Sequence, residues 1–423
     1  MNTSLNHLPR RDHGRLTELD WLRVIAFGLL ILYHVGMYYV SWDWHVKSPR
    51  LVPGLEAAML WLNPWRMSLL FLISGAAIGL MVERGSQGLI RQRSARLLLP
   101  LLFGMAVVVP PQSYLQVVEK FGYAGSYLDF LQLYAHAYHG FCSDSADGRT
   151  CLTLPTWNHL WFLPYLWCYT MLALLLCKAG PWTRHAGWSG LVSGTRVLWV
   201  PWLVLALLRQ HLMPLFPIRN DLVHDWYHHA LSLSMFVVGM ALFGHRDDRH
   251  GAWAAVHRWR WVALVLAVVV QISFQCWSDS YGDNEDVSTA SLMALRVLSS
   301  GRQWLPLVAV LGWGRHWLAQ RDSLTLRWLT QAVFPFYIVH QTATVVSAHW
   351  LAQQQWPLAL EAAAVVAFTV VVCGAAAWLA MQVSWLRPWM GLAPKGPEAL
   401  KTLKALNDSD ALNESKALNQ SKT

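Results

Sequence analysis

Long apolar segments recur from one end of the sequence to the other, and they constrain the fold more than any other feature. We place ten of them, at residues 19–40, 57–82, 97–118, 157–178, 197–217, 230–244, 261–278, 291–313, 330–351 and 357–383. Helical segments of about 20 residues match the thickness of the hydrocarbon core of a bilayer. Only 13% of the residues are charged, about half of the fraction typical of soluble domains. The sequence therefore predicts an all-α, polytopic membrane protein with about ten transmembrane helices.

Basic residues cluster in alternate connections between these segments. The arginine-rich stretches are residues 10–15, 84–96, 184–196, 246–260 and 315–327. The connection at residues 279–286, in contrast, is acidic. The positive-inside rule then predicts that both termini are cytoplasmic. This topology accounts for the net charge of +9, so we expect no nucleic-acid partner.

We divide the chain into three parts. Residues 1–18 form a short cytoplasmic segment, residues 19–390 a single membrane domain, and residues 391–423 a tail with the similar hexamers ALNDSD, ALNESK and ALNQSK. Polar, low-complexity sequence of this kind predicts a disordered cytoplasmic tail. The first apolar segment follows basic residues, but its length and its internal Arg23 and His34 favour a retained helix over a cleaved signal peptide.

Two of the six cysteines, Cys142 and Cys151, lie together in the polar segment FCSDSADGRTC. The predicted topology puts this segment on the periplasmic side, where an oxidising environment favours disulfide formation. We expect a disulfide between them, with two free surface thiols as the alternative. Histidine-rich stretches such as HRDDRH lack the ligand spacing of a zinc site, so we assign no metal.

Arg23 and His34 are the leading candidates for chemistry, because both interrupt the first apolar segment. Eleven positions separate them, which returns a helix to nearly the same face about 16 Å further along its axis. Such residues are costly in a membrane and usually face a polar interior. A neutral His34 would act as a general base, and Arg23 would bind an anionic group at the cytoplasmic edge. The structural alternatives are an interhelical hydrogen bond for His34 and snorkelling to the headgroups for Arg23.

Three further arginines accompany this pair. Arg93 and Arg96 are three residues apart at the cytoplasmic end of the third segment, so they share a helix face and would bind the phosphates of a nucleotide-like donor. Contact with anionic lipid is the alternative for these two residues. Arg66 lies inside the second segment, at a depth comparable with that of His34, which indicates a polar cavity open to the outer side.

Four residues of the outer half are candidates for binding a substrate. Trp44 and His45 lie in the first outer connection, His159 begins the fourth segment, and His340 lies inside the ninth. Indole rings stack on sugar faces, but they also mark any membrane interface. Interhelical hydrogen bonds are the alternative role for His340, and anchoring of the helix is the alternative for His159.

These motifs together resemble the acyltransferase 3 family of integral membrane proteins. The first-helix signature of that family, an Arg, ten residues and a His, corresponds to Arg23 and His34. Its FxxSG, RxxR and YxxH motifs correspond to residues 71–75, 93–96 and 337–340. Many members also have a WSLxxE-like motif, where this chain has WFLPYLW without a Glu.

A narrower resemblance is to the glucan-biosynthesis protein C branch of this family. It rests on the fragment WHVKS at residues 44–48, on Arg66-Met67 ahead of the FxxSG motif, and on HLWFL at residues 159–163. That branch is implicated in the succinylation of periplasmic glucans. It also has WFL in the place of the WSLxxE-like motif.

The resemblance implies a multi-pass O-acyltransferase of the bacterial inner membrane, with cytoplasmic acyl-CoA as its co-substrate. Arg23, Arg93 and Arg96 would hold the phosphates of CoA. His34 would activate the acceptor hydroxyl or assist a transient acyl transfer, and Arg66 would stabilise an oxyanion or the carboxylate of a succinyl group. The acceptor would be a periplasmic glycan. The alternatives are a lipid or small-molecule acceptor, a transporter, and a non-catalytic assembly factor.

Overall fold

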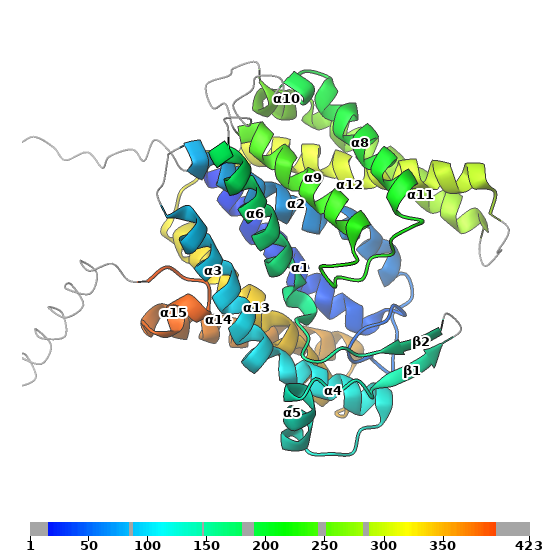
Figure 1. Ribbon diagram of the computed structural model, residues 1–423. Helices are drawn as coiled ribbons and strands as arrows, with labels where there is room; N and C mark the ends of the chain where they lie inside the picture. Colours follow the sequence, from blue (N-terminus) through cyan, green and yellow to red (C-terminus); the bar gives the residue numbers. More distant parts are fainter. Residues whose placement is uncertain are drawn as a thin grey trace, which may run out of the picture.

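The computed structural model describes residues 16–83, 88–145, 148–179, 190–243, 251–281 and 287–394. Long helices dominate these residues (Figure 1). The first half contains α1 (Thr17–Tyr39), α2 (Leu55–Glu83), α3 (Leu89–Phe103), the π-helical turn η1 (Gly104–Val108), α4 (Val109–Phe121), α5 (Tyr127–Ala135), the strands β1 (Cys142–Ser145) and β2 (Gly148–Cys151), the 3-10 turn η2 (Asn158–Trp161) and α6 (Phe162–Ala179). The second half contains α8 (Arg196–Leu212), α9 (Trp226–Phe243), α10 (Ala252–Arg258), α11 (Arg260–Tyr281), α12 (Thr289–Leu318), α13 (Leu324–Ala352), α14 (Leu358–Gln382) and α15 (Leu386–Trp389).

Every predicted apolar segment coincides with one of these helices or with a continuous run of them. Within the described residues, seven spans are long and apolar enough to cross a membrane, and one of these runs through α3, η1 and α4. The prediction of an all-α polytopic membrane protein is therefore confirmed. Helices α8, α12 and α13 coincide with the remaining three segments; α8 has only 17 residues. The count of ten and the cytoplasmic termini stay predictions, and the predicted tail lies almost entirely outside the described residues.

Successive long helices run in opposite directions, so their ends gather at two faces. We call the face at which α1 begins the near face and the opposite face the far face. At the near face, Thr17 Oγ1 of α1 donates to the carbonyl of Leu318 at the end of α12 over 3.3 Å. At the far face, the loop after α1 contacts the end of α4, where Lys120 binds Asp43 of the loop. The same loop contacts the connection after α13, where Arg50 donates to the backbone carbonyl of Trp356. Helix α1 packs against α2, α12, α13 and α14, which places its residues inside the bundle (Figure 1).

Helices α2 and α9 approach each other closely at a pair of glycines. A Cβ atom at Gly75 would lie 1.9 Å from the carbonyl oxygen of Phe236, and one at Gly239 would lie 2.0 Å from that of Leu72. Only residues without a side chain allow the two backbones to touch in this way. The glycine of the FxxSG motif thus has a packing role, and it fixes α2 against α9 next to the candidate site.

The far face carries a small elaboration built from α5 and a two-stranded antiparallel sheet. Strands β1 and β2 pair with Cys142 opposite Cys151, and a disulfide joins these two residues. The predicted disulfide is therefore confirmed. An aromatic cluster with Phe130 at its centre packs α5 against α4.

Candidate functional site

The candidate site is centred on a contact between His34 of α1 and His340 of α13. His34 Nδ1 lies 2.8 Å from His340 Nε2, and the two rings are stacked with centroids 5.0 Å apart. His340 is completely buried. The two residues are 306 positions apart in the chain, so the packing of α1 against α13 brings them together.

Backbone carbonyls of α13 determine how the protons are arranged in this pair. His340 Nδ1 lies 2.7 Å from the carbonyl oxygen of Tyr337 and 3.2 Å from that of Phe336. A carbonyl oxygen only accepts, so His340 Nδ1 carries the hydrogen and, in the neutral ring, its Nε2 carries a lone pair. His34 Nδ1 must then donate to that lone pair. This assignment leaves His34 Nε2 as the unprotonated, basic nitrogen, the form that a general base needs.

The first far-face loop covers His34. Trp44, one of the predicted acceptor-binding residues, is only 8% exposed, and its indole ring stacks on the His34 ring at 6.5 Å between centroids. Lys47 holds the loop in place, because its Nζ donates to the carbonyl of Met37 in the last turn of α1 over 2.7 Å and to that of Trp42 in the loop over 2.9 Å. The WHVKS fragment thus contains both the ring above His34 and the side chain that caps α1.

His45 begins a chain of hydrogen bonds beneath the same loop. Its Nδ1 lies 2.6 Å from Gln116 Oε1, and its Nε2 lies 2.6 Å from Gln341 Nε2. These contacts require His45 to donate through Nδ1 and to accept at Nε2, which is the neutral ring. Burial lowers the pKa of His45 to about 4, and the positive charge of Lys120 acts in the same direction. His45 is therefore uncharged at neutral pH and acts as a connector in the hydrogen-bond chain.

The chain of hydrogen bonds continues to His159. Gln341 Nε2 donates to Gln112 Oε1 over 3.0 Å, and Gln112 Nε2 lies 3.4 Å from His159 Nδ1. His159 Nε2 donates in turn to the carbonyl of Ile338 over 2.9 Å. Both nitrogens of His159 are thereby engaged, and its ring meets that of His340 edge-on at 5.1 Å. The structure thus brings His34, His45, His159 and His340 into one connected polar core.

Arg66 of α2 lies beside this core. Its guanidinium carbon is 3.2 Å from the centre of the Tyr33 ring, and its charge acts on both His34 and His340. Arg66 Nε and Nη1 are buried, and within the described part of the chain they make no hydrogen bond. Burial of a cation with unsatisfied donors is costly, which is the kind of strain that a functional anion site contains.

A second polar region lies nearer the near face. Arg23, Arg93 and Arg96 all line one cavity with a volume of about 130 Å³. The three cations lie close enough for the charges of Arg23 and Arg96 to act on Arg93, a repulsion that a bound anion would relieve. Arg23 also lies 3.9 Å from Asp20, one turn earlier on α1. The structure thus brings together the three arginines that were predicted to bind the donor.

A group of aromatic rings separates this cavity from the histidine core. Phe27, Phe162 and Phe334 line the cavity. All three contact the Tyr337 ring, at 5.5, 6.2 and 6.3 Å between centroids. Tyr337 in turn supplies the carbonyl that orients His340 and donates its hydroxyl hydrogen to the carbonyl of His159 over 2.7 Å. The arginine cavity and the histidine core are therefore neighbouring compartments with one shared wall.

Sequence reasoning missed the glutamines of the core. Gln112 is completely buried and Gln341 is 3% exposed, and both lie within apolar segments. A polar amide side chain inside an apolar segment is the sequence signal that could have identified both residues. The partner of His34 was not predictable, because several intramembrane histidines were equally suited to it. Among the described residues, no group of three or more His, Cys, Asp or Glu side chains could hold a metal ion.

Comparison with known families agrees with this geometry. Residues 16–378 match the acyltransferase 3 family model, which is described as an acyltransferase domain. The match covers most of the sequence, so the chain belongs to the acyltransferase 3 family and is a membrane-embedded enzyme of the O-acyltransferase type. No curated protein and no solved structure matches the chain. The family assignment favours an enzyme over a transporter or an assembly factor, and the narrower glucan-biosynthesis branch stays a prediction.

Proposed function

We propose that this acyltransferase moves an acyl group, with succinyl as the leading candidate, from cytoplasmic acyl-CoA to a hydroxyl of a periplasmic glycan. The enzyme would lie in the bacterial inner membrane with its near face toward the cytoplasm. Arg23, Arg93 and Arg96 hold the phosphates of CoA, His34 is the general base, and Arg66 binds the negative charge that develops during transfer. No metal takes part in this proposal.

The observation that carries the proposal is the alignment of two compartments along α1. The arginine cavity contains Arg23, and the His34–His340 contact lies eleven residues further along the same helix, about 16 Å away. Three cations suit the phosphates of CoA, and guanidinium groups bind phosphate oxygens through paired donors. A donor bound by its phosphates in the cavity would extend its thioester toward His34, past the ring of Tyr337.

The chemistry follows from the arrangement of protons in the histidine pair. The acceptor hydroxyl attacks the thioester carbonyl while His34 Nε2 takes its proton, and a new C–O bond forms. The C–S bond then breaks, and the proton passes from His34 to the departing thiolate of CoA. His340 Nε2 accepts the hydrogen bond of His34 Nδ1–H throughout, so it stabilises the imidazolium intermediate.

Arg66 supports this reaction in one of two ways. Its buried Nε and Nη1 donors lie unpaired within the described residues beside His34. A preorganised cation at this position stabilises the oxyanion of the tetrahedral intermediate. The same donors also suit the distal carboxylate of a succinyl group. The two roles differ in their dependence on the acyl group, since only the second requires a dicarboxylic donor.

The test is mass spectrometry of periplasmic glycans from a deletion strain that carries either wild-type protein or His34→Ala. The wild type should restore an acyl modification that the variant does not restore. Equal restoration by both would refute the role of His34. If the deletion changes no glycan, the acceptor is wrong, and extraction of the lipids from the same cells then shows whether a lipid is acylated instead.

A lipid acceptor is the second candidate, and one feature favours it. An apolar cavity of about 420 Å³ lies among α1, α13 and α14, and Phe27 and Val333 line both this cavity and the arginine cavity. Exposed side chains such as Leu32 and Val370 border it. A lipid chain in this cavity would lie next to the donor site. Acylation of a lipid that requires His34, with unchanged glycans, would favour this candidate.

A further inference from the structure

Two hydroxyl groups in the arginine cavity take no part in the proposed reaction. Ser74 of α2 and Thr170 of α6 line this cavity of about 130 Å³ together with the three arginines. Thr170 is only 1% exposed. Within the described residues, neither hydroxyl makes a hydrogen bond. Buried polar groups are nearly always paired, so an unpaired hydroxyl on the wall of a cavity points to a contact with a ligand.

Hydroxyl groups on neighbouring helices show the contrast. A serine or threonine inside a helix can satisfy its own hydroxyl by donating to the carbonyl four residues earlier. Thr330 of α13 lines the same cavity, and its hydroxyl donates to the carbonyl of Leu326 over 2.9 Å. Ser234 of α9 makes the equivalent bond over 2.7 Å. Ser74 and Thr170 do not make this bond, so the donor and the acceptor capacity of both hydroxyls are left for a ligand.

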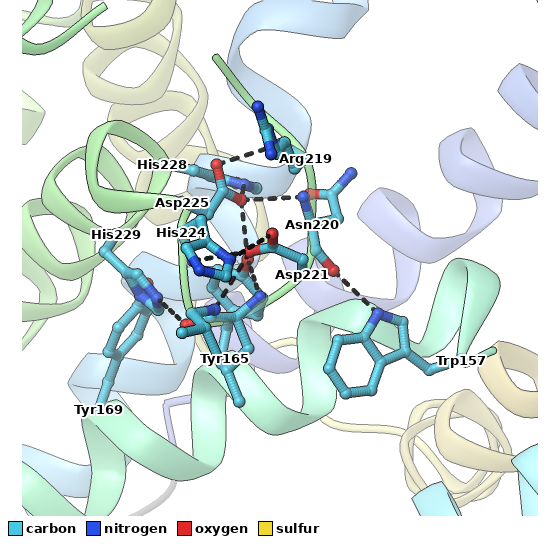
Figure 2. Close-up of polar contacts among 12 residues, drawn as sticks. Trp157, Tyr165, Tyr169, Arg219, Asn220, Asp221, His224, Asp225, His228 and His229 are labelled. Atoms are coloured by element: carbon cyan, nitrogen blue, oxygen red, sulfur yellow. Dashed lines mark hydrogen bonds and ion pairs between the residues drawn. The ribbon is translucent and has the colours of Figure 1, made fainter. Parts of the chain in front are cut away.

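Contacts elsewhere on α6 hold Thr170 toward the cavity. Tyr165 donates its hydroxyl hydrogen to Asp225 over 2.7 Å, and the hydroxyl of Tyr169 lies 2.9 Å from His229 Nδ1 (Figure 2). Asp225 directly precedes α9 and His229 lies in its first turn. The two contacts therefore tie α6 to the beginning of α9 and limit its rotation about its own axis. Both tyrosine hydroxyls are engaged, in contrast with that of Thr170.

Ring contacts between α2 and α6 bring the two hydroxyls to the same part of the cavity. The Phe71 ring of α2 lies 4.6 Å from that of Phe162 and 5.6 Å from that of Tyr169, measured between centroids. Ser74 follows Phe71 by about one helical turn, and Thr170 directly follows Tyr169. The packing that joins α2 to α6 therefore also positions Ser74 and Thr170.

The depth of the hydroxyls places them between the arginines and the aromatic wall. Ser74 and Thr170 each lie nine residues before the near-face end of their helix, or about 14 Å along its axis. Arg93 and Arg96 lie four and seven residues after the start of α3, at about 6 and 10 Å. Phe27 of the wall lies ten residues into α1, at about 15 Å. A donor that reaches from the arginines to the wall therefore passes the two hydroxyls.

We propose that Ser74 and Thr170 bind the amide groups of the pantetheine arm of the donor. In CoA this arm connects the phosphates to the thioester, and each of its amides has one N–H donor and one carbonyl acceptor. A hydroxyl group can accept from the first and donate to the second. The inference rests on the proposed function, since it concerns how the acyl-CoA donor is held.

These contacts select one class of acyl donor. An acyl phosphate also has an anionic group for the arginines, but it has no amide at the position of the two hydroxyls. Its binding would leave both hydroxyls buried and unpaired, which is costly. Ser74 and Thr170 thus make the cavity specific for a pantetheine thioester, whereas the arginines alone recognise phosphate in general.

The test measures the binding of two probes to the full-length protein in detergent by isothermal titration calorimetry. The probes are CoA and adenosine 3′,5′-bisphosphate, which is a nucleotide without the pantetheine arm. Thr170→Val and Ser74→Ala should each bind CoA about three- to tenfold more weakly and bind the bisphosphate like wild type. Thr170→Ser keeps a hydroxyl and should recover the affinity for CoA. Thr330→Val is the matched control, because the Thr330 hydroxyl is engaged by its own helix; it should bind both probes like wild type.

Thermal melting separates binding from a structural role. Because the Thr170 hydroxyl has no partner among the described residues, Thr170→Val should melt at or above the temperature of wild type. A clearly lower melting temperature would show that the hydroxyl stabilises the fold, and it would overturn the inference.

The two probes distinguish failure of this inference from failure of the proposed function. If CoA binds to wild type and to both hydroxyl variants equally, or if a variant loses affinity for both probes alike, the arm contacts are wrong and the donor proposal stands. If wild type binds neither probe, the donor proposal fails and the arm contacts fail with it. If CoA binds through the hydroxyls but no acyl group is transferred, the arm contacts stand and the proposed reaction is wrong.

Discussion

The hydrogen bond from His34 to His340 leads to the most specific prediction. Replacing His340 with Ala removes the acceptor that, among the described residues, holds the His34 hydrogen on Nδ1, at a distance of 2.8 Å. During reaction His34 becomes an imidazolium, and a hydrogen bond to a charged group contributes about 1.5 to 3 kcal/mol. This range corresponds to a fall in kcat of roughly ten- to hundredfold. The freed ring also adopts the other tautomer part of the time, which adds to the loss.

The assay is steady-state acyl transfer by purified protein, with kcat and KM for the acyl-CoA donor determined separately. Because His340 lies apart from the arginine cavity, His340→Ala should lower kcat and leave the donor KM within about twofold. His340→Gln should recover part of the rate, since an amide oxygen can accept from His34 Nδ1. His349→Ala is the control on the same helix, where His349 Nδ1 contacts Glu119 at 2.6 Å near the surface.

Three results would refute this reasoning. The first is an unchanged kcat in a folded His340→Ala protein. The second is an equal loss in the His349→Ala control, which would indicate a general effect on α13. The third is a rise in the donor KM without a fall in kcat, which would place His340 in donor binding, whereas the sequence predicted a role in acceptor binding.

Three further predictions follow from other contacts. Replacing Arg93 and Arg96 together with Ala should raise the KM for acyl-CoA about a hundredfold with a smaller change in kcat, as measured by steady-state kinetics. The Gly75→Ala change places a Cβ 1.9 Å from a backbone carbonyl of α9 and should destabilise the protein by about 1 to 3 kcal/mol in thermal melts; Gly28→Ala, with nothing within 4 Å, should melt like wild type. Burial lowers the pKa of His45 from 6.5 to about 4, so the unfolded chain binds the proton more readily; stability should fall by about 3 kcal/mol as the pH drops from 6.5 to 4, and a His45→Gln variant should lack this component.

Much of the fold was predictable because each membrane helix must be apolar along its own length. The helices lie where the apolar segments predicted them, and α1 spans Thr17–Tyr39 where residues 19–40 were expected. The disulfide between Cys142 and Cys151 was predictable from a short polar loop with two cysteines. The third span includes a π-helical turn at residues 104–108, which its apolar sequence does not reveal.

The sequence by itself determined which residues are unusual. Arg23, His34 and Arg66 are costly inside a membrane, so their presence alone predicts a polar interior and candidate chemistry. Helical periodicity also determined that Arg23 and His34 share one face of α1. These inferences need only local information, because they depend on the composition and spacing of a single segment.

Only the tertiary structure decided which of these residues meet. His34 and His340 are 306 positions apart, and their contact depends on the packing of α1 against α13. The orientation of the His34 base depends on carbonyls of α13, and the chain through His45 depends on glutamines from α4 and α13. A sequence specifies hydrogen-bonding groups one at a time, whereas partners and tautomers are properties of pairs that exist only after the helices have packed.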